Sequence, residues 1–199
     1  MKIAIIKYNA GNLFSVDCAL KRLSVEPVIT NDKETLLSAD KVIFPGVGEA
    51  RTTMDYLKAC HMDLLIKELK QPVLGICLGM QLLCRHSEEG DADCLGIFDA
   101  EVKRFQSTNP EEKVPHMGWN SLHFAHNGKL FQGIEEGAYV YFVHSYYLEA
   151  EEESIVKASA EYGVHIHASV EKENVFACQF HPEKSGETGL KILKNFTEL

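Results

Sequence analysis

A cysteine between two glycines, Cys77 in the segment Gly75–Gly79, is the residue best suited to nucleophilic chemistry in this chain. It follows the apolar run Pro72–Ile76, a predicted strand, and precedes Leu78–Arg85, a predicted helix. A Gly-x-nucleophile-x-Gly segment at a strand-to-helix junction is the pattern of a nucleophile elbow. The helix N-terminus favours the thiolate, and the N–H of Leu78 would point to a tetrahedral oxyanion. The pattern alone is equally compatible with an unreactive buried cysteine.

A thiol nucleophile needs a proton acceptor that is held by a third group. His181 follows the apolar run Val175–Phe180, and Pro182 ends the predicted strand there. In an extended chain, residues two apart project to the same side, so the Glu183 carboxylate is predicted to lie near the His181 imidazole. His181 would take the thiol proton and later donate it to leaving ammonia. Taken alone, His-Pro-Glu is also a common surface turn.

The other histidines and cysteines do not predict a metal centre. His165 and His167 alternate along a predicted strand, but no third ligand is evident, and none of the six cysteines forms a C-x-x-C pair. We therefore expect no metal and no cofactor, and we interpret the cysteines without a catalytic setting as buried, reduced thiols.

The composition bounds the partners and the location. The formal net charge is −9 and no basic run occurs, so nucleic acid is not expected as a partner. No apolar run approaches the roughly 20 residues that span a bilayer, and the apolar run Ile3–Ile6 is too short for a signal peptide. We expect no membrane association and a cytoplasmic location.

The elements that position Cys77 and His181 follow from hydrophobic periodicity. In the first half of the chain, predicted strands and helices alternate, which is typical of a mostly parallel central sheet flanked by helices. The predicted strands are Lys2–Ile6, Pro27–Thr30, Lys41–Phe44 and Pro72–Ile76, and the predicted helices are Leu13–Leu23, Arg51–Lys70 and Leu78–Arg85.

The second half is predicted to be β-rich. Its short strands are Glu101–Phe105, Trp119–Phe124, Tyr139–Val143, Ser154–Ala160, His165–Val170 and Val175–Phe180. Glu149–Glu153 is interpreted as a solvated loop, and a helix is predicted over Thr188–Leu199. No linker separates the two halves, so the fold class is α/β with a single domain over residues 1–199.

Two segments resemble the class I (triad) glutamine amidotransferases, namely Gly75–Gln81 and Gln179–Ser185. Further segments make the chain similar, more narrowly, to the glutaminase subunits of imidazole glycerol phosphate synthase. These segments are Gly11–Leu13, Pro45–Gly48, Pro115–Asn120 and Phe142–Tyr146. The similarity covers nearly the whole chain in the same order, and it implies the amidotransferase fold.

The resemblance implies a role for each matching residue. Cys77 would form a γ-glutamyl thioester, and His181 and Glu183 would complete the triad. Backbone N–H groups of Leu78 and of the segment Gly46–Val47 would hold the oxyanion. Matching glutamine-binding positions are Gln81, Glu89, Gly48, His144, Ser145 and Tyr146.

Gln81 lies one helical turn after Cys77, on the same face. Glu89 would pair with the α-amino group of glutamine, although beside Glu88 it is also compatible with an exposed loop acid. Asn12, with Gly11, and Lys184 match positions at a subunit interface.

The resemblance also implies the partners. The substrate would be L-glutamine, and ammonia would pass to a (β/α)₈-barrel cyclase/synthase subunit in a heterodimer. The barrel would then make imidazole glycerol phosphate and aminoimidazole carboxamide ribotide in histidine biosynthesis. One departure affects the expected interface: the first strand ends in Lys7-Tyr8-Asn9-Ala10, where the family usually has an acidic residue.

Other functions remain open at this point. One is a paralogous amidotransferase subunit of a surface-sugar pathway, with a related barrel partner. Another is a stand-alone Cys-His-Glu thiol hydrolase, against which Gln81 and the segments Pro45–Gly48 and Pro115–Asn120 argue. A non-catalytic binding subunit is disfavoured by the intact triad.

Overall fold

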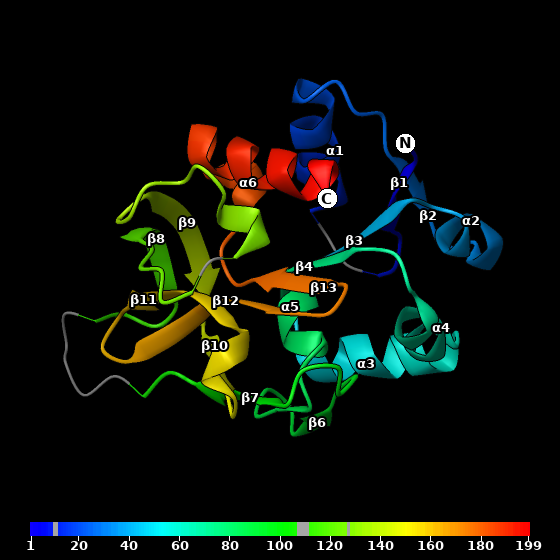
Figure 1. Cartoon of the computed structure of the whole chain (residues 1–199). Helices are drawn as coiled ribbons and strands as arrows, with labels where there is room; N and C mark the ends of the chain where they lie inside the picture. Colours follow the sequence, from blue (N-terminus) through cyan, green and yellow to red (C-terminus); the bar gives the residue numbers. More distant parts are fainter. Residues whose placement is uncertain (10–11, 107–111, 127) are drawn as a thin grey trace.

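The computed structural model describes residues 1–9, 12–106, 112–126 and 128–199, and it is built around a seven-stranded sheet with the order β11-β12-β13-β4-β3-β1-β2 (Figure 1). The strands are β1 (Ile3–Ile6), β2 (Val28–Thr30), β3 (Lys41–Gly46), β4 (Val73–Cys77), β11 (Val156–Glu161), β12 (His165–Lys172) and β13 (Val175–Cys178). Strands β2, β1, β3, β4 and β13 run parallel, whereas β12 pairs antiparallel with β13 and β11 pairs antiparallel with β12. The predicted mostly parallel sheet is confirmed.

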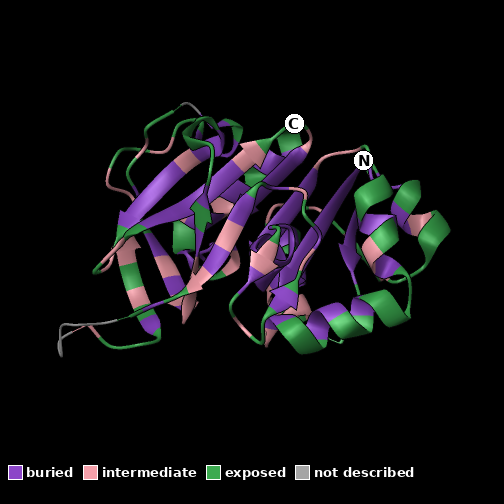
Figure 2. Ribbon diagram, turned by 90° about the horizontal axis from the view of Figure 1, so that it is seen from below, coloured by how far each residue is buried: buried purple, intermediate pink, exposed green. Residues whose placement is uncertain are grey.

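Helices cover both faces of this sheet (Figure 1). They are α1 (Leu13–Arg22), α2 (Lys33–Leu37), α3 (Ala50–Ala59), α4 (Met62–Glu68), α5 (Leu78–Leu82) and α6 (Gly186–Glu198). Alternation along β1 explains the division, because successive side chains point to opposite faces. Ile3 and Ile5 pack with α1 and α6, whereas Ala4 and Ile6 pack with α3, α4 and α5. Figure 2 shows the resulting buried strands beneath helices with exposed outer faces.

The second half adds two smaller sheets. A four-stranded sheet has the order β10-β7-β5-β6, and a two-stranded sheet pairs β8 with β9. The strands are β5 (His86–Ser87), β6 (Ala92–Asp93), β7 (Ala100–Arg104), β8 (His116–Ser121), β9 (Tyr139–His144) and β10 (Tyr146–Ala150). Three short 3₁₀ helices complete the fold, namely η1 (Lys129–Phe131), η2 (Glu153–Ile155) and η3 (Pro182–Lys184). The predicted β-rich second half is confirmed.

Several local features differ from the predictions. Strands β5, β6 and β10 were not predicted, the helix predicted over Leu78–Arg85 ends at Leu82, and the strand predicted from Ser154 begins at Val156. The helix predicted over residues 51–70 is two helices, because His61 has a left-handed backbone (φ 56°) that ends the first. The loop predicted over Glu149–Glu153 is partly wrong, since β10 continues to Ala150 and η2 begins at Glu153. Helix α2 was not predicted, and its five residues begin at a cap in which Asp32 accepts from Thr35 N at 2.8 Å.

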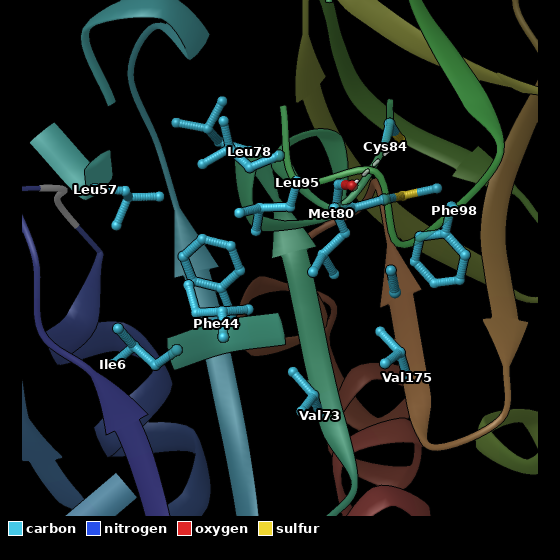
Figure 3. Packing of buried hydrophobic residues seen from close by; sticks show 14 of the residues in the cluster. Ile6, Phe44, Leu57, Val73, Leu78, Met80, Cys84, Leu95, Phe98 and Val175 are labelled. Atoms are coloured by element: carbon cyan, nitrogen blue, oxygen red, sulfur yellow. Dashed lines mark hydrogen bonds between the residues drawn. The ribbon is translucent and has the colours of Figure 1, made fainter. Parts of the chain in front are cut away.

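The core beneath the strand-to-helix junction is continuous. Figure 3 shows buried side chains of β3, β4, α3 and α5 in one cluster, among them Phe44, Val73, Leu57, Leu78 and Met80. Because these side chains are fully or almost fully buried, the junction after β4 rests on closely packed neighbours. Within the described ranges, no helix is long and apolar enough to cross a membrane.

Candidate active site

Cys77 ends β4 and immediately precedes α5, at the junction that the sequence predicts. Its backbone has φ 52° and ψ −109°, a conformation that non-glycine residues rarely adopt and that marks functional strain. A Cβ on Gly79 would collide with the Phe44 carbonyl oxygen, and a Cβ on Gly75 would lie 2.6 Å from Leu83 Cδ1. The flanking glycines are therefore required by close approach, and together they hold the thiol in the elbow.

The thiol opens into a pocket of about 310 Å³, a size that suits a small ligand. Nine of the predicted site residues are among those that line it. The lining residues are Val47, Gly48, Cys77, Leu78, Gln81, Glu89, Pro115, Val143, His144, Ser145 and Tyr146.

His181 and Glu183 lie together, as their spacing predicts. The His181 backbone N–H donates to Tyr141 O at 2.9 Å, and its Nδ1 lies 2.7 Å from Glu183 Oε1. Both side chains are fully buried. Burial lowers the pKa of His181, but interactions with Cys77 and Glu183 outweigh it and raise this pKa to about 10. Because Nδ1 is bonded to Glu183, Nε2 is the nitrogen left for the thiol.

Asn12 lies against this pair. Its side-chain amide donates to Glu183 Oε1, and its left-handed backbone (φ 74°) places it just before α1, where it makes no side-chain capping bond. Its predicted interface position stays a prediction. Gly11, predicted beside it, and Ala10 lie outside the described residues.

Gln81 and the unpredicted residue Gln179 form a buried amide chain. Gln81 Nε2 donates to Tyr146 O at 3.1 Å and to Gln179 Oε1 at 2.9 Å. Gln179 Nε2 in turn lies 3.6 Å from Cys77 Sγ. The sequence held one signal for Gln179, since it is two residues before His181 at the end of the same apolar run.

Glu89 is a half-buried carboxylate in the pocket wall. Its Oε2 accepts from Ala50 N, at the start of α3, at 2.8 Å. Burial raises the pKa of its carboxyl. The alternative of an exposed loop acid does not hold, because Glu89 is placed towards the pocket and bonded to a helix N-terminus.

The predicted oxyanion segment follows β3 beside the elbow. Val47 and Gly48 line the pocket, whereas a Cβ on Gly46 would collide with the Tyr8 hydroxyl and approach Leu78 Cβ at 3.0 Å. Tyr8 donates its hydroxyl to Pro45 O at 2.5 Å, and burial raises the pKa of Tyr8. Tyr8, which the sequence marked only as part of a departure from the family pattern, thus anchors this segment.

An apolar face flanks the site on β8 and β9. Met117, Trp119 and Tyr139 are 62%, 54% and 60% exposed, and the strand register puts them on one side, with Trp119 opposite Tyr141. This face is next to His181, whose N–H bonds to Tyr141. Lys184, in η3, is also exposed.

The chain is similar to known proteins over nearly its whole length. The family described as glutamine amidotransferase class-I matches residues 7–199. The chain is 62% identical over 199 residues to the imidazole glycerol phosphate synthase subunit HisH of Bacteroides fragilis strain YCH46, and 46% identical over 200 residues to the HisH subunit of Escherichia coli K12, with 100% of both chains covered in each case.

Solved structures share the fold. PurLQS from Thermotoga maritima superposes with a TM-score of 0.73 at 20% identity, covering 99% of this chain and 97% of that one. A glutamine amidotransferase from the same organism superposes with a TM-score of 0.67 at 18% identity, covering 99% and 82%.

Proposed function

The chain belongs to the class-I glutamine amidotransferases and, within them, to the HisH subunits of imidazole glycerol phosphate synthase, and from this premise we propose how its residues work. It is the glutaminase subunit of that enzyme, acts in histidine biosynthesis and hydrolyses glutamine to glutamate and ammonia. We propose that residues 1–199 form one glutaminase domain, which the match over residues 7–199 supports.

We propose Cys77 as the nucleophile. Its thiolate attacks the carboxamide carbon of glutamine, and the backbone N–H groups of Leu78 and the segment Gly46–Val47 stabilise the oxyanion. The His181 imidazolium donates its proton to the departing nitrogen, so ammonia leaves and a γ-glutamyl thioester remains. His181 then accepts a proton from water, whose oxygen attacks the thioester and releases glutamate and the thiolate.

The electrostatics of the pair support this assignment. Interactions with Cys77 and Glu183 raise the pKa of His181 to about 10, so the imidazole holds the proton that ammonia needs at neutral pH. Glu183 fixes Nδ1 as a donor, which leaves Nε2 for Cys77 and the leaving group.

We propose that the pocket residues bind glutamine. Glu89 would pair with the α-amino group, and the backbone around Gly48 and His144–Tyr146 would hold the rest of the substrate. Both hydrogens on Gln81 Nε2 are used within the protein, so its Oε1 is the atom left to accept a bond from the substrate.

We propose a (β/α)₈-barrel synthase subunit as the partner that receives the ammonia. The names of the relatives describe subunits of a synthase. The exposed apolar side chains of Met117, Trp119 and Tyr139 would form the centre of the contact, with Asn12 and Lys184 at its polar margin. We also propose a cytoplasmic location, which cell fractionation would test.

One observation carries the proposal: a strained elbow cysteine lines a small pocket and interacts with a buried His-Glu pair behind it. The test is glutamine turnover by the chain with and without its synthase subunit, for the wild type and Cys77→Ala. We expect turnover to be slow without the partner, to rise by orders of magnitude with it, and to vanish in the variant. Cys60→Ala, at an exposed cysteine, is the control and should match the wild type.

Two outcomes would contradict the proposal. Turnover that survives Cys77→Ala would remove the nucleophile assignment. Full turnover without a partner would instead favour the stand-alone hydrolase.

A further inference from the structure

Gln179 is a fully buried glutamine whose side chain touches the proposed nucleophile. Its Nε2 lies 3.6 Å from Cys77 Sγ, within the range of a hydrogen bond to sulfur. The sulfur also lies 3.9 Å from the Val143 carbonyl oxygen and interacts with His181. A carbonyl only accepts, so Val143 suits the thiol, whereas a side-chain N–H suits the thiolate.

The Tyr146 carbonyl determines the orientation of the Gln179 amide through two successive hydrogen bonds. Tyr146 O can only accept, so the atom of Gln81 that faces it must be Nε2. The same Nε2 faces Gln179, which must therefore present Oε1 to it. Nε2 of Gln179 therefore faces Cys77. A flipped Gln179 amide would instead place its own Nε2 next to Nε2 of Gln81, so that two donors would face each other.

We propose that Gln179 is a catalytic residue that donates an N–H to the Cys77 thiolate, held in register by Gln81 and Tyr146. The inference rests on the proposed function of Cys77. A neutral donor suits this place because His181 already brings a positive charge to the buried site. When Cys77 forms the thioester, its sulfur becomes a weaker hydrogen-bond acceptor. The Gln179 amide then only holds the sulfur in position.

If Gln179 had a purely structural role, its replacement would have a different effect. The amide chain joins α5, β10 and the end of β13, so losing it would lower stability or distort the pocket without changing how Cys77 responds to pH. Among the described residues, the titratable groups that interact with Cys77 include His181, Tyr8 and Cys178, and these are the same in every variant below.

The experiment measures the alkylation rate of Cys77 by iodoacetamide in the full chain between about pH 5 and 9. Tandem mass spectrometry of the tryptic peptide 71–85 assigns the modification to Cys77 rather than to Cys84, which lies in the same peptide. Gln179→Met keeps the length but removes the donor, and we expect the rate at neutral pH to fall about tenfold and its acidic limb to move to higher pH. In Gln179→Glu the new side chain has a similar shape but places a carboxylate beside the sulfur. The alkylation rate of this variant should fall further than that of Gln179→Met.

The matched control is Gln71→Met. Gln71 Nε2 also donates to a buried backbone carbonyl, Leu36 O at 2.7 Å, but it is remote from the site. This variant should alkylate like the wild type. Thermal unfolding checks each fold, and if Gln179→Met does not fold, Gln179→Asn withdraws the amide while keeping it in the core and should show the same shift.

An alkylation profile of Gln179→Met or Gln179→Asn that coincides with the wild type would overturn the inference. The pH profile of kcat/KM in the complex with the synthase subunit should shift in the same direction. Failure of the proposed function is distinguishable, because alkylation does not depend on glutamine. A wild-type complex without glutaminase activity but with the alkylation shift would refute the function and leave the role of Gln179 intact.

Discussion

Asn12 donates its side-chain amide to Glu183 Oε1, the same carboxylate oxygen that accepts from Nδ1 of His181. The two residues are 171 positions apart in the chain. Since the Glu183 side chain is fully buried, few other groups can hold its charge and orientation. Asn12 is therefore a positioning residue for the proposed triad.

Replacing Asn12 by Ala should reduce kcat about tenfold, with little change in the KM for glutamine. A hydrogen bond to a charged group contributes about 1.5–3 kcal/mol, and the loss lets Glu183 turn away from His181. The measurement is steady-state glutaminase kinetics in the complex with the synthase subunit at saturating concentration.

The control for Asn12 is the double variant with Glu183→Gln. If Asn12 acts through Glu183, the double variant should be no slower than Glu183→Gln alone. Partner affinity is measured in parallel, because Asn12 is also predicted at the interface. If the losses in kcat of the two single variants are additive in the double variant, or if a higher concentration of the synthase subunit restores kcat, Asn12 belongs to the interface instead.

The pKa of His181, raised to about 10, sets an expected alkaline limit on activity. The leaving nitrogen needs the imidazolium proton, so kcat/KM should hold through neutral pH and fall as pH rises through about 10. Anions raise this pKa, so Glu183→Gln should move the alkaline limb to lower pH. Glu187→Gln, at an exposed acid beyond η3, should not. An alkaline limb that stays in place in Glu183→Gln would contradict the role of Glu183.

Glu89→Gln should weaken glutamine binding. The amide still has an oxygen for Ala50 N, but it has no charge to pair with the substrate's α-ammonium group. Truncating one side of a desolvated charge pair costs about 2 kcal/mol or more, so we expect KM to rise at least tenfold at nearly constant kcat. Glu88→Gln, the exposed neighbour, is the control. A fall in kcat with an unchanged KM would place Glu89 elsewhere in the mechanism.

The parts of the site that the sequence predicted are the local ones. The elbow at Cys77 depends on two glycines within five residues, and the His181–Glu183 contact depends on a two-residue spacing. Periodicity likewise predicted the alternating first half, because one face of each element is buried.

The parts that the sequence missed depend on tertiary packing. Gln179 meets Gln81 across 98 positions, and Tyr8 meets Pro45 across 37. No periodic pattern records such pairs. The break between α3 and α4 at the left-handed residue His61 was also missed, because no glycine or proline marks it in the sequence.

The two buried histidines beside the pocket form a directed hydrogen-bond chain. His144 Nδ1 lies 2.8 Å from Tyr146 O and must donate to it, so its Nε2 accepts from His116 Nδ1 at 2.9 Å. His116 is also stacked on Tyr162, with ring centroids 3.9 Å apart. The chain thus holds the Tyr146 carbonyl that orients Gln81, and it requires His144 to be neutral, because its Nε2 must accept.

This chain makes stability depend on pH. Burial lowers the pKa of His116 to about 4 and that of His144 to about 3, whereas a histidine in the unfolded chain has a pKa of about 6.5. Below about pH 6.5 the unfolded chain therefore binds more protons than the folded one. The free energy of unfolding should be fully retained above that pH and should fall as pH drops towards 4.

His116→Asn tests this dependence, because the Asn amide nitrogen can take the place of Nδ1 and still donate to His144 without titrating. Between pH 6.5 and 5, each of these histidines removes up to about 2 kcal/mol of stability. The variant should therefore lose less stability than the wild type when urea unfolding at pH 7.5 is compared with pH 5. His61→Asn, at an exposed histidine whose left-handed backbone suits Asn, should leave the difference unchanged. Equal losses in His116→Asn and the wild type would mean that His116 is already protonated in the folded state at pH 5, and the lowered pKa of His116 would then be wrong.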